Sequence, residues 1–173
     1  MRMFLLPALV ALLAGCSPAE NWRQIGFEGT ALKAQLPCKP DRTSREVPLG
    51  GVPVQLSVAG CESGGAMLAV MTAALAPGTD AQAVLLGWQK ATALHWQAAE
   101  PQTQAWAQAG MLPLSAAREL RTQAITPDGR TVDTRAVWGA FAEGDHVRLV
   151  HAVVHAPKVS DALAKTLFDG VQP

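Results

Sequence analysis

Residues 43–60 read Thr-Ser-Arg-Glu-Val-Pro-Leu-Gly-Gly-Val-Pro-Val-Gln-Leu-Ser-Val-Ala-Gly, and this stretch contains the clearest signal for the fold. The consecutive glycines Gly50 and Gly51 accept the positive φ angles that a tight two-residue hairpin turn requires. After the turn, apolar residues occupy every second position, as in a strand with one buried face: Val52, Val54, Leu56 and Val58. The stretch therefore predicts an antiparallel hairpin of strands 43–49 and 52–60.

Period-two and helical patterns predict further elements on both sides of this hairpin. Strands are expected over residues 27–36, 66–73, 117–126, 130–141 and 146–156. Helices are expected over residues 81–98, capped by Thr79-Asp80, and over residues 161–168. Residues 99–113 lack a clean period and are expected to form an irregular connection. Because every strand-to-strand link is short enough for a hairpin, the pattern predicts an α+β domain, an antiparallel sheet of about six to seven strands packed against two helices.

Composition is typical of an ordinary single-domain globular protein. The 173 residues are enough to bury one core without depending on a metal. The 14 basic and 14 acidic side chains cancel, and neither sign collects into a long run, so a nucleic-acid partner is not expected. After residue 16, no apolar run approaches the roughly 18 residues of a transmembrane helix.

The first sixteen residues have the three parts of a secretory signal: a basic start, an apolar stretch and a small-residue site. The last four residues, Leu13-Ala14-Gly15-Cys16, resemble the lipobox of bacterial lipoproteins in all four positions. The resemblance implies cleavage between Gly15 and Cys16, a diacylglyceryl thioether on Cys16, and further acylation, with palmitate for example, of the freed amine. Two or more acyl chains anchor a protein stably in membrane lipid. The alternative is a plain secretory signal that happens to end in cysteine.

The lipobox divides the chain into three parts. Residues 1–15 are expected to be the signal peptide, residues 16–24 the lipidated N-terminus with a short polar tether, and residues 25–173 a single globular domain. Ser17 stands where an Asp would resemble an inner-membrane retention signal. The expected location is therefore the periplasmic face of the outer membrane in a bacterial cell envelope.

The remaining cysteines, Cys38 and Cys61, form an even pair in a protein expected to be exported to an oxidising compartment, and this favours a disulfide. If Leu49 faces Val52 in the hairpin, then Cys61 lies opposite Pro40 and close enough to reach Cys38. The alternative is a redox-active pair, but catalytic dithiols usually have Cys-x-x-Cys spacing.

A second resemblance covers most of residues 25–171. It rests on the strand ending in Leu36-Pro37-Cys38-Lys39-Pro40, the hairpin, the central helix, the Asp128-Gly129 turn, the paired strands and a last helix with Leu167-Phe168-Asp169. In pattern and order these features resemble the PsbP-like fold of small exported bacterial proteins. The resemblance implies an antiparallel sheet between helices, used mostly for binding and assembly, with no shared catalytic centre.

Three histidines raise the alternative of a metal-dependent or hydrolytic envelope enzyme: His146, His151 and His155. In a strand, however, residues four apart are separated by roughly 13 Å, too far for His151 and His155 to share one ion. His146 would point to the other face. The sequence also lacks a nucleophile-elbow pattern and a phosphate-binding glycine loop. We therefore expect no catalytic residue, no metal and no other cofactor, and the alternative for the histidines is partial burial or surface exposure.

Three tryptophans lie in or just after the expected central helix, and they are candidates to line an apolar pocket or an interface: Trp88, Trp96 and Trp106. The alternative is that these rings simply pack a core. Taken together, the residues favour a membrane-anchored periplasmic lipoprotein whose domain is a non-catalytic module that binds an envelope protein or a small apolar ligand. A structural or assembly lipoprotein acting with a partner is the other non-catalytic interpretation.

Overall fold

The computed structural model describes residues 21–173, which form eleven regular elements. In chain order these are β1 (Arg23–Gly26), β2 (Lys33–Leu36), β3 (Asp41–Leu49), β4 (Val52–Ser63), β5 (Ala66–Leu75), α1 (Ala81–His95), β6 (Ala99–Ala105), β7 (Arg118–Ile125), β8 (Thr131–Glu143), β9 (His146–Ala156) and α2 (Asp161–Asp169). The expected signal peptide and lipidated Cys16 lie outside the described residues. No helix within residues 21–173 is long and apolar enough to cross a membrane.

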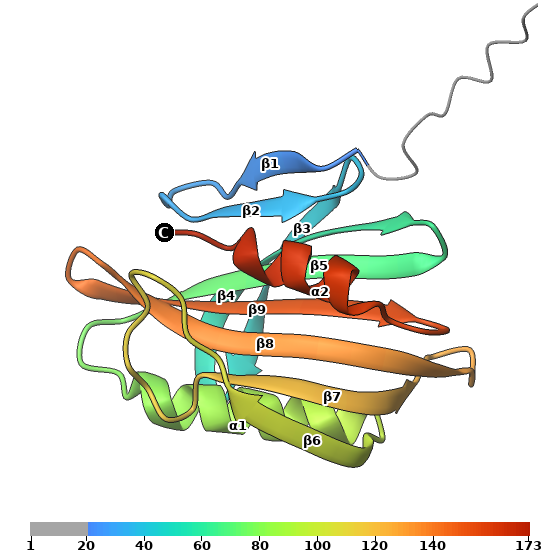
Figure 1. Ribbon diagram of the computed structural model, residues 1–173. Helices are drawn as coiled ribbons and strands as arrows, with labels where there is room; N and C mark the ends of the chain where they lie inside the picture. Colours follow the sequence, from blue (N-terminus) through green and yellow to red (C-terminus); the bar gives the residue numbers. More distant parts are fainter. Residues whose placement is uncertain (1–20) are drawn as a thin grey trace, which may run out of the picture.

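Seven strands form one antiparallel sheet in the order β3-β4-β5-β9-β8-β7-β6 (Figure 1). Strands β3, β4 and β5 follow one another through short turns, and so do β7, β8 and β9. The β5–β9 pairing joins these two groups at the centre of the sheet. With β1 and β2 as a separate two-stranded sheet and the two helices, the domain is α+β as predicted.

The two helices cover opposite faces of the sheet (Figure 1). Alternate side chains of β9 separate accordingly, because successive residues of a strand point to opposite faces. Leu149 and Val153 pack in one buried cluster with Leu85 and Trp88 of α1. Side chains of the other parity, such as Val154, pack on the opposite face in a second cluster with α2 and the β1–β2 hairpin. The domain therefore has two apolar cores separated by one sheet.

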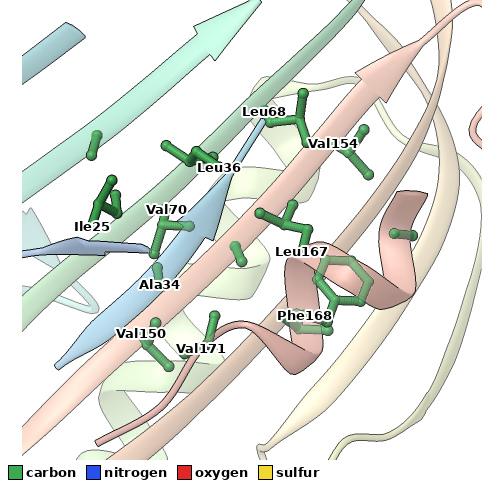
Figure 2. Close-up of a cluster of buried hydrophobic side chains, with 14 of the residues drawn as sticks. Ile25, Ala34, Leu36, Leu68, Val70, Val150, Val154, Leu167, Phe168 and Val171 are labelled. Carbon is green, nitrogen blue, oxygen red and sulfur yellow. The ribbon is translucent and has the colours of Figure 1, made fainter. Parts of the chain in front are cut away.

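Figure 2 shows the core beneath α2, where side chains from β1, β2, β5, β9 and α2 meet. Leu36 of β2, Leu68 of β5 and Val154 of β9 are fully buried, and Phe168 of α2 is 4% exposed. The short α2 begins at Ser160, whose side chain accepts a hydrogen bond from the Leu163 N–H. The β1–β2 hairpin and α2 therefore together cover this face of the large sheet.

The hairpin predicted from Gly50 and Gly51 is present with the expected register. Leu49 pairs with Val52, and the pairing continues without a shift to Asp41 and Gly60. Both turn glycines have positive φ, 56° and 85°. The glycines therefore set the register of the whole β3–β4 ladder, as a two-residue turn does.

The predicted disulfide is confirmed. Cys38 and Cys61 are bonded, with Cα atoms 6.1 Å apart. Cys38 follows β2 and Cys61 lies in β4, so the bond ties the small β1–β2 sheet to the large one.

Two sequence expectations about local structure are corrected. The expected strand over residues 27–36 is instead a turn followed by the four residues of β2, and β1 precedes it. Gly29 has a φ of 71°, so the chain reverses at this residue rather than extending. As a result β1 starts at Arg23, inside the segment that was expected to be a tether.

The second correction concerns residues 99–113, expected to be irregular. Residues 99–105 form the edge strand β6, whose seven residues are all exposed, so neither face carries an apolar pattern. The pairing of β6 with β7 shifts between Ala99 and Gln102, where Glu100 has a φ of 46°. The preceding helix α1 ends at His95, three residues earlier than expected, and Gln97 adopts a φ of 48° just after it.

Candidate functional site

The central pair of strands places two methionines opposite two histidines on the face that α1 covers. Met71 of β5 pairs directly with His151 of β9, and Met67 pairs with His155. Directly opposed side chains on one face have Cβ atoms about 4.5–5.5 Å apart. The β5–β9 pairing therefore sets a row of thioethers beside a row of imidazoles beneath α1.

A cleft of about 390 Å³ opens between this part of the sheet and α1, and we call it the α1 cleft. Its lining is mostly apolar and comes from β3, β4, β5, β9 and the C-terminal half of α1. The lining residues are Arg45, Val47, Leu49, Leu56, Met67, Met71, Trp88, Ala91, Thr92, His95, Trp96, His151, Val153 and His155. Its size and mixture of aromatic, aliphatic and few polar groups are those of a small-ligand pocket.

Three tryptophans surround the His151 ring at the floor of the cleft. The ring of Trp138 in β8 is stacked on it, with centroids 4.3 Å apart and planes 7° apart. Trp88 meets the same ring edge-on at 5.3 Å. Trp96, in the turn that ends α1, lies 6.0 Å from His151 and 5.0 Å from the ring of His155. Trp96 is therefore the aromatic group shared by both histidines.

Both histidines form a hydrogen bond through Nδ1, and the bond of His151 defines which of its ring nitrogens carries the proton. Nδ1 of His151 lies 3.0 Å from the carbonyl oxygen of Val137. Because a carbonyl only accepts, Nδ1 carries the proton and donates, which leaves Nε2 with a lone pair. Nδ1 of His155 lies 2.7 Å from Oγ1 of Thr134. Burial lowers the pKa of His151 to about 3 and the pKa of His155 to about 4, so both rings are neutral at neutral pH.

The neighbouring Trp138 has one unusual feature. Its indole Nε1 is buried and has no hydrogen-bond partner within residues 21–173. A buried donor without a partner costs about 1–3 kcal/mol, so the stacking on His151 and the apolar packing must offset that loss.

The structure gathers some of the sequence-predicted site residues and separates others. Trp88 and Trp96 both line the α1 cleft, as the pocket hypothesis expects. Trp106 does not join them, because it packs in the cluster on the opposite face and reaches the backbone at Gly139. His146 is likewise apart, since it is exposed beside Asp145 at the start of β9.

The face that α2 covers contains a buried ion network instead of a cleft. Arg135 donates from Nε to Glu119 at 2.9 Å and from Nη1 to Asp161 at the start of α2 at 2.6 Å. Burial raises the pKa of Glu119, but the hydrogen bonds from Arg135 and Gln104 and the charge of Arg135 outweigh it and hold the pKa below its usual value. This network joins α2 to β7 and β8, and we assign it a structural role.

Outside the cleft, an open and mostly polar hollow of about 530 Å³ lies over β6 and β7, beside Gln102 and Arg121. Its exposed, hydrated walls suit neither an apolar ligand nor catalysis. Within residues 21–173, no group of three or more His, Cys, Asp or Glu side chains has the arrangement of a metal site.

No protein-family model matches the chain, and no curated protein matches it significantly.

Among the residues that sequence reasoning missed are Met67 and Met71, which line the cleft, and Trp138, which stacks on His151. The two methionines lie in a continuous apolar run, where nothing distinguishes a cleft residue from a core residue. Their position opposite the histidines depends on the β5–β9 pairing, which joins segments about eighty residues apart and leaves no local signal.

Proposed function

We propose that this chain is a lipid-anchored protein of a bacterial envelope whose domain binds a small apolar ligand in the α1 cleft. The anchor follows from the lipobox residues Leu13-Ala14-Gly15-Cys16, which lie outside the described residues. The Cys38–Cys61 disulfide supports export, because such bonds persist in oxidising compartments. Ser17 after the lipidated position supports attachment to the periplasmic face of the outer membrane.

The proposal includes membership in the PsbP-like fold. The support is an antiparallel sheet with helices on both faces, in the element order that the resemblance implies. This fold is used mostly for binding and assembly, which agrees with a ligand-binding role.

The observation that carries the proposal is the α1 cleft itself. A cavity of about 390 Å³ is large enough for a small organic molecule, and the partly exposed ring of Trp96 and the thioethers of Met67 and Met71 provide adaptable apolar contacts. The lining residues include no Ser, Cys, Asp or Glu, so the cleft offers imidazoles without a nucleophile or an acid to partner them. Binding therefore fits the geometry better than hydrolysis.

The ligand-binding role is tested with an apolar fluorescent probe, N-phenyl-1-naphthylamine, added to the purified protein. We expect saturable binding to one site, with energy transfer from tryptophan. Ala91→Trp places a large ring at the mouth of the cleft from an exposed helix position and is expected to weaken probe binding by about tenfold or more, a loss of about 1.4 kcal/mol.

The matched control is Ala83→Trp, an identical change at an exposed position of α1 that does not line the cleft. It should leave probe affinity unchanged. Unsaturable binding to the original protein, or equal loss in both variants, would remove the basis for a ligand in the cleft.

The anchor is tested separately by mass spectrometry of the protein isolated from membranes. We expect a mature chain that starts at Cys16 and carries the mass of two or three acyl groups. Cys16→Ala should release the protein from the membrane fraction or leave it unprocessed. An intact Met1 or an unmodified Cys16 would contradict the proposed anchor and location.

A further inference from the structure

One row of side chains crosses three neighbouring strands at the outer end of the α1 cleft. Glu62 of β4 pairs with Met67 of β5, and Met67 pairs with His155 of β9. Side chains alternate along β4, and Val58 belongs to the cluster beneath α1, so Glu62, four residues further on, lies on the same face. A carboxylate, a thioether and an imidazole therefore occupy adjacent positions on one surface.

Two of these groups are available to a ligand from solvent. Met67 is 37% exposed, which is unusual for a large apolar side chain in a central part of the sheet. His155 is half-buried. If its Nδ1 donates to the Thr134 hydroxyl, 2.7 Å away, then Nε2 presents its lone pair, and an ordered partner on one ring nitrogen is the usual support for a metal bound to the other.

The ligand types select a soft ion. Thioether sulfur is a poor ligand for Mg²⁺, Ca²⁺ or Zn²⁺ and a good one for Cu(I), and imidazole also suits copper. Structural Zn²⁺ needs four ligands, and the described residues contain no group of three His, Cys, Asp or Glu side chains arranged for a metal. A monovalent ion held by a neutral imidazole and a neutral thioether has a net charge of one, which the neighbouring Glu62 carboxylate neutralises.

An indole lies beside the proposed ligand His155, since the ring of Trp96 meets the imidazole edge-on with centroids 5.0 Å apart. The inner pair, Met71 and His151, is less suitable, because His151 is fully buried among tryptophans and a charge there would lose its hydration without compensation.

We propose that Glu62, Met67 and His155 form a binding site for one Cu(I) ion at the rim of the α1 cleft. His155 and Met67 supply the ligand nitrogen and sulfur, and Glu62 supplies the compensating charge. His151 is not a ligand, so the separation of the two histidines along β9 presents no obstacle. The site shares the cleft with the proposed apolar ligand but does not depend on that ligand.

The test is a titration of the purified protein with Cu(I), buffered by a chromophoric Cu(I) chelator, and a parallel titration with Ag(I) in chloride-free buffer as a redox-stable probe. We expect one ion per chain and a change in tryptophan fluorescence. Loss of supporting partners alone lowers metal affinity by about 10–100-fold. Met67→Leu and His155→Gln, which remove a ligand, should lower it by at least as much.

Met71→Leu is the matched control, an identical change on the same strand and face, one histidine pair further inward. It should alter Cu(I) affinity by no more than about twofold, and near-ultraviolet circular dichroism should show that each variant is folded. Failure of the original protein to bind a stoichiometric ion overturns the proposal, as does an equal effect of Met67→Leu and Met71→Leu. Glu62 does not line the cleft, so Glu62→Gln should weaken Cu(I) binding and retain the naphthylamine probe, and failures of the metal site and of the apolar site are distinguishable.

Discussion

Helix α1 approaches the β3–β4 turn through a contact between two glycines, and this contact predicts an unusual effect of a helix-favouring substitution. A Cβ atom at Gly87 would lie 2.5 Å from the Cα of Gly50. Carbon atoms in contact prefer about 3.5–4.0 Å. Gly87→Ala therefore requires a displacement of about 1 Å or more, and the atom in the way belongs to the backbone and has no rotamer to change.

Two opposing terms set the size of the effect. Alanine in a helix interior is more favourable than glycine by about 1 kcal/mol. Overpacking against a fixed backbone costs about 1–3 kcal/mol, and Gly50 has little freedom to move, because its own turn conformation fixes the β3–β4 register. We expect Gly87→Ala to lower the free energy of unfolding by about 1 kcal/mol. Without the contact between Gly87 and Gly50, the same change would raise the free energy of unfolding by about 1 kcal/mol. The sign of the measured change therefore distinguishes the two cases.

The assay is denaturant unfolding followed by circular dichroism, with the disulfide intact. Lys90, an exposed position three residues further along α1, calibrates the helix term through the difference between Lys90→Ala and Lys90→Gly. A Gly87→Ala protein more stable than the original, by the amount that the Lys90 pair gives, would refute the close approach of α1 to the turn.

Four further predictions concern other parts of the domain. Replacing Cys38 and Cys61 with serine together should lower the free energy of unfolding by roughly 3 kcal/mol, as closure of a loop of 23 residues predicts, and a change below about 1 kcal/mol in denaturant unfolding would count against this estimate. Arg135→Met should lower the free energy of unfolding by about 3 kcal/mol, because it leaves the Glu119 carboxylate buried without its main partner. Arg135→Met combined with Glu119→Gln should lower it by less, and a double-mutant cycle measures the difference. The pKa of Glu119 is lowered in the folded state, so the carboxylate stabilises the fold at pH values above its unfolded pKa, and this stabilisation is lost as pH falls through its folded pKa. Glu119→Gln should therefore make the free energy of unfolding less dependent on pH between these two pKa values. Burial lowers the pKa of His151 to about 3 in the folded state, against about 6.5 for an unperturbed histidine, so as pH falls the unfolded chain takes up a proton before the folded chain does. Stability should therefore fall as pH drops from about 6.5 towards 3, by up to about 1.4 kcal/mol per pH unit. His151→Phe should reduce that slope in unfolding measured across the range, and an unchanged slope would show that His151 is not the group responsible.

The features predictable from the sequence are those encoded by neighbouring residues. Gly50 and Gly51 determine a two-residue turn, the turn determines the register of β3 and β4, and the register brings Cys61 within reach of Cys38. Each step needs only local backbone geometry. The same reasoning locates α1 from its Asp80 cap and its apolar spacing.

The features that were missed lack such local encoding. The turn at Gly29 was interpreted as part of a strand over residues 27–36, because partial alternation continues across this glycine and only its conformation reveals the turn. Strand β6 has no buried face, so no apolar pattern marks it. The α1 cleft depends on β5 pairing with β9, and a pairing between distant segments is decided by the packing of the whole sheet rather than by any nearby residue.

The irregular pairing of β6 affects how the protein behaves at high concentration. A sheet border with a regular row of free N–H and C=O groups can recruit a strand from another molecule. On β6, Pro101 removes one donor and Glu100 bends the chain out of register, while the opposite border strand, β3, contains Pro48 and several charged side chains. Both ends of the sheet thus discourage copies of the chain from joining edge to edge into longer assemblies.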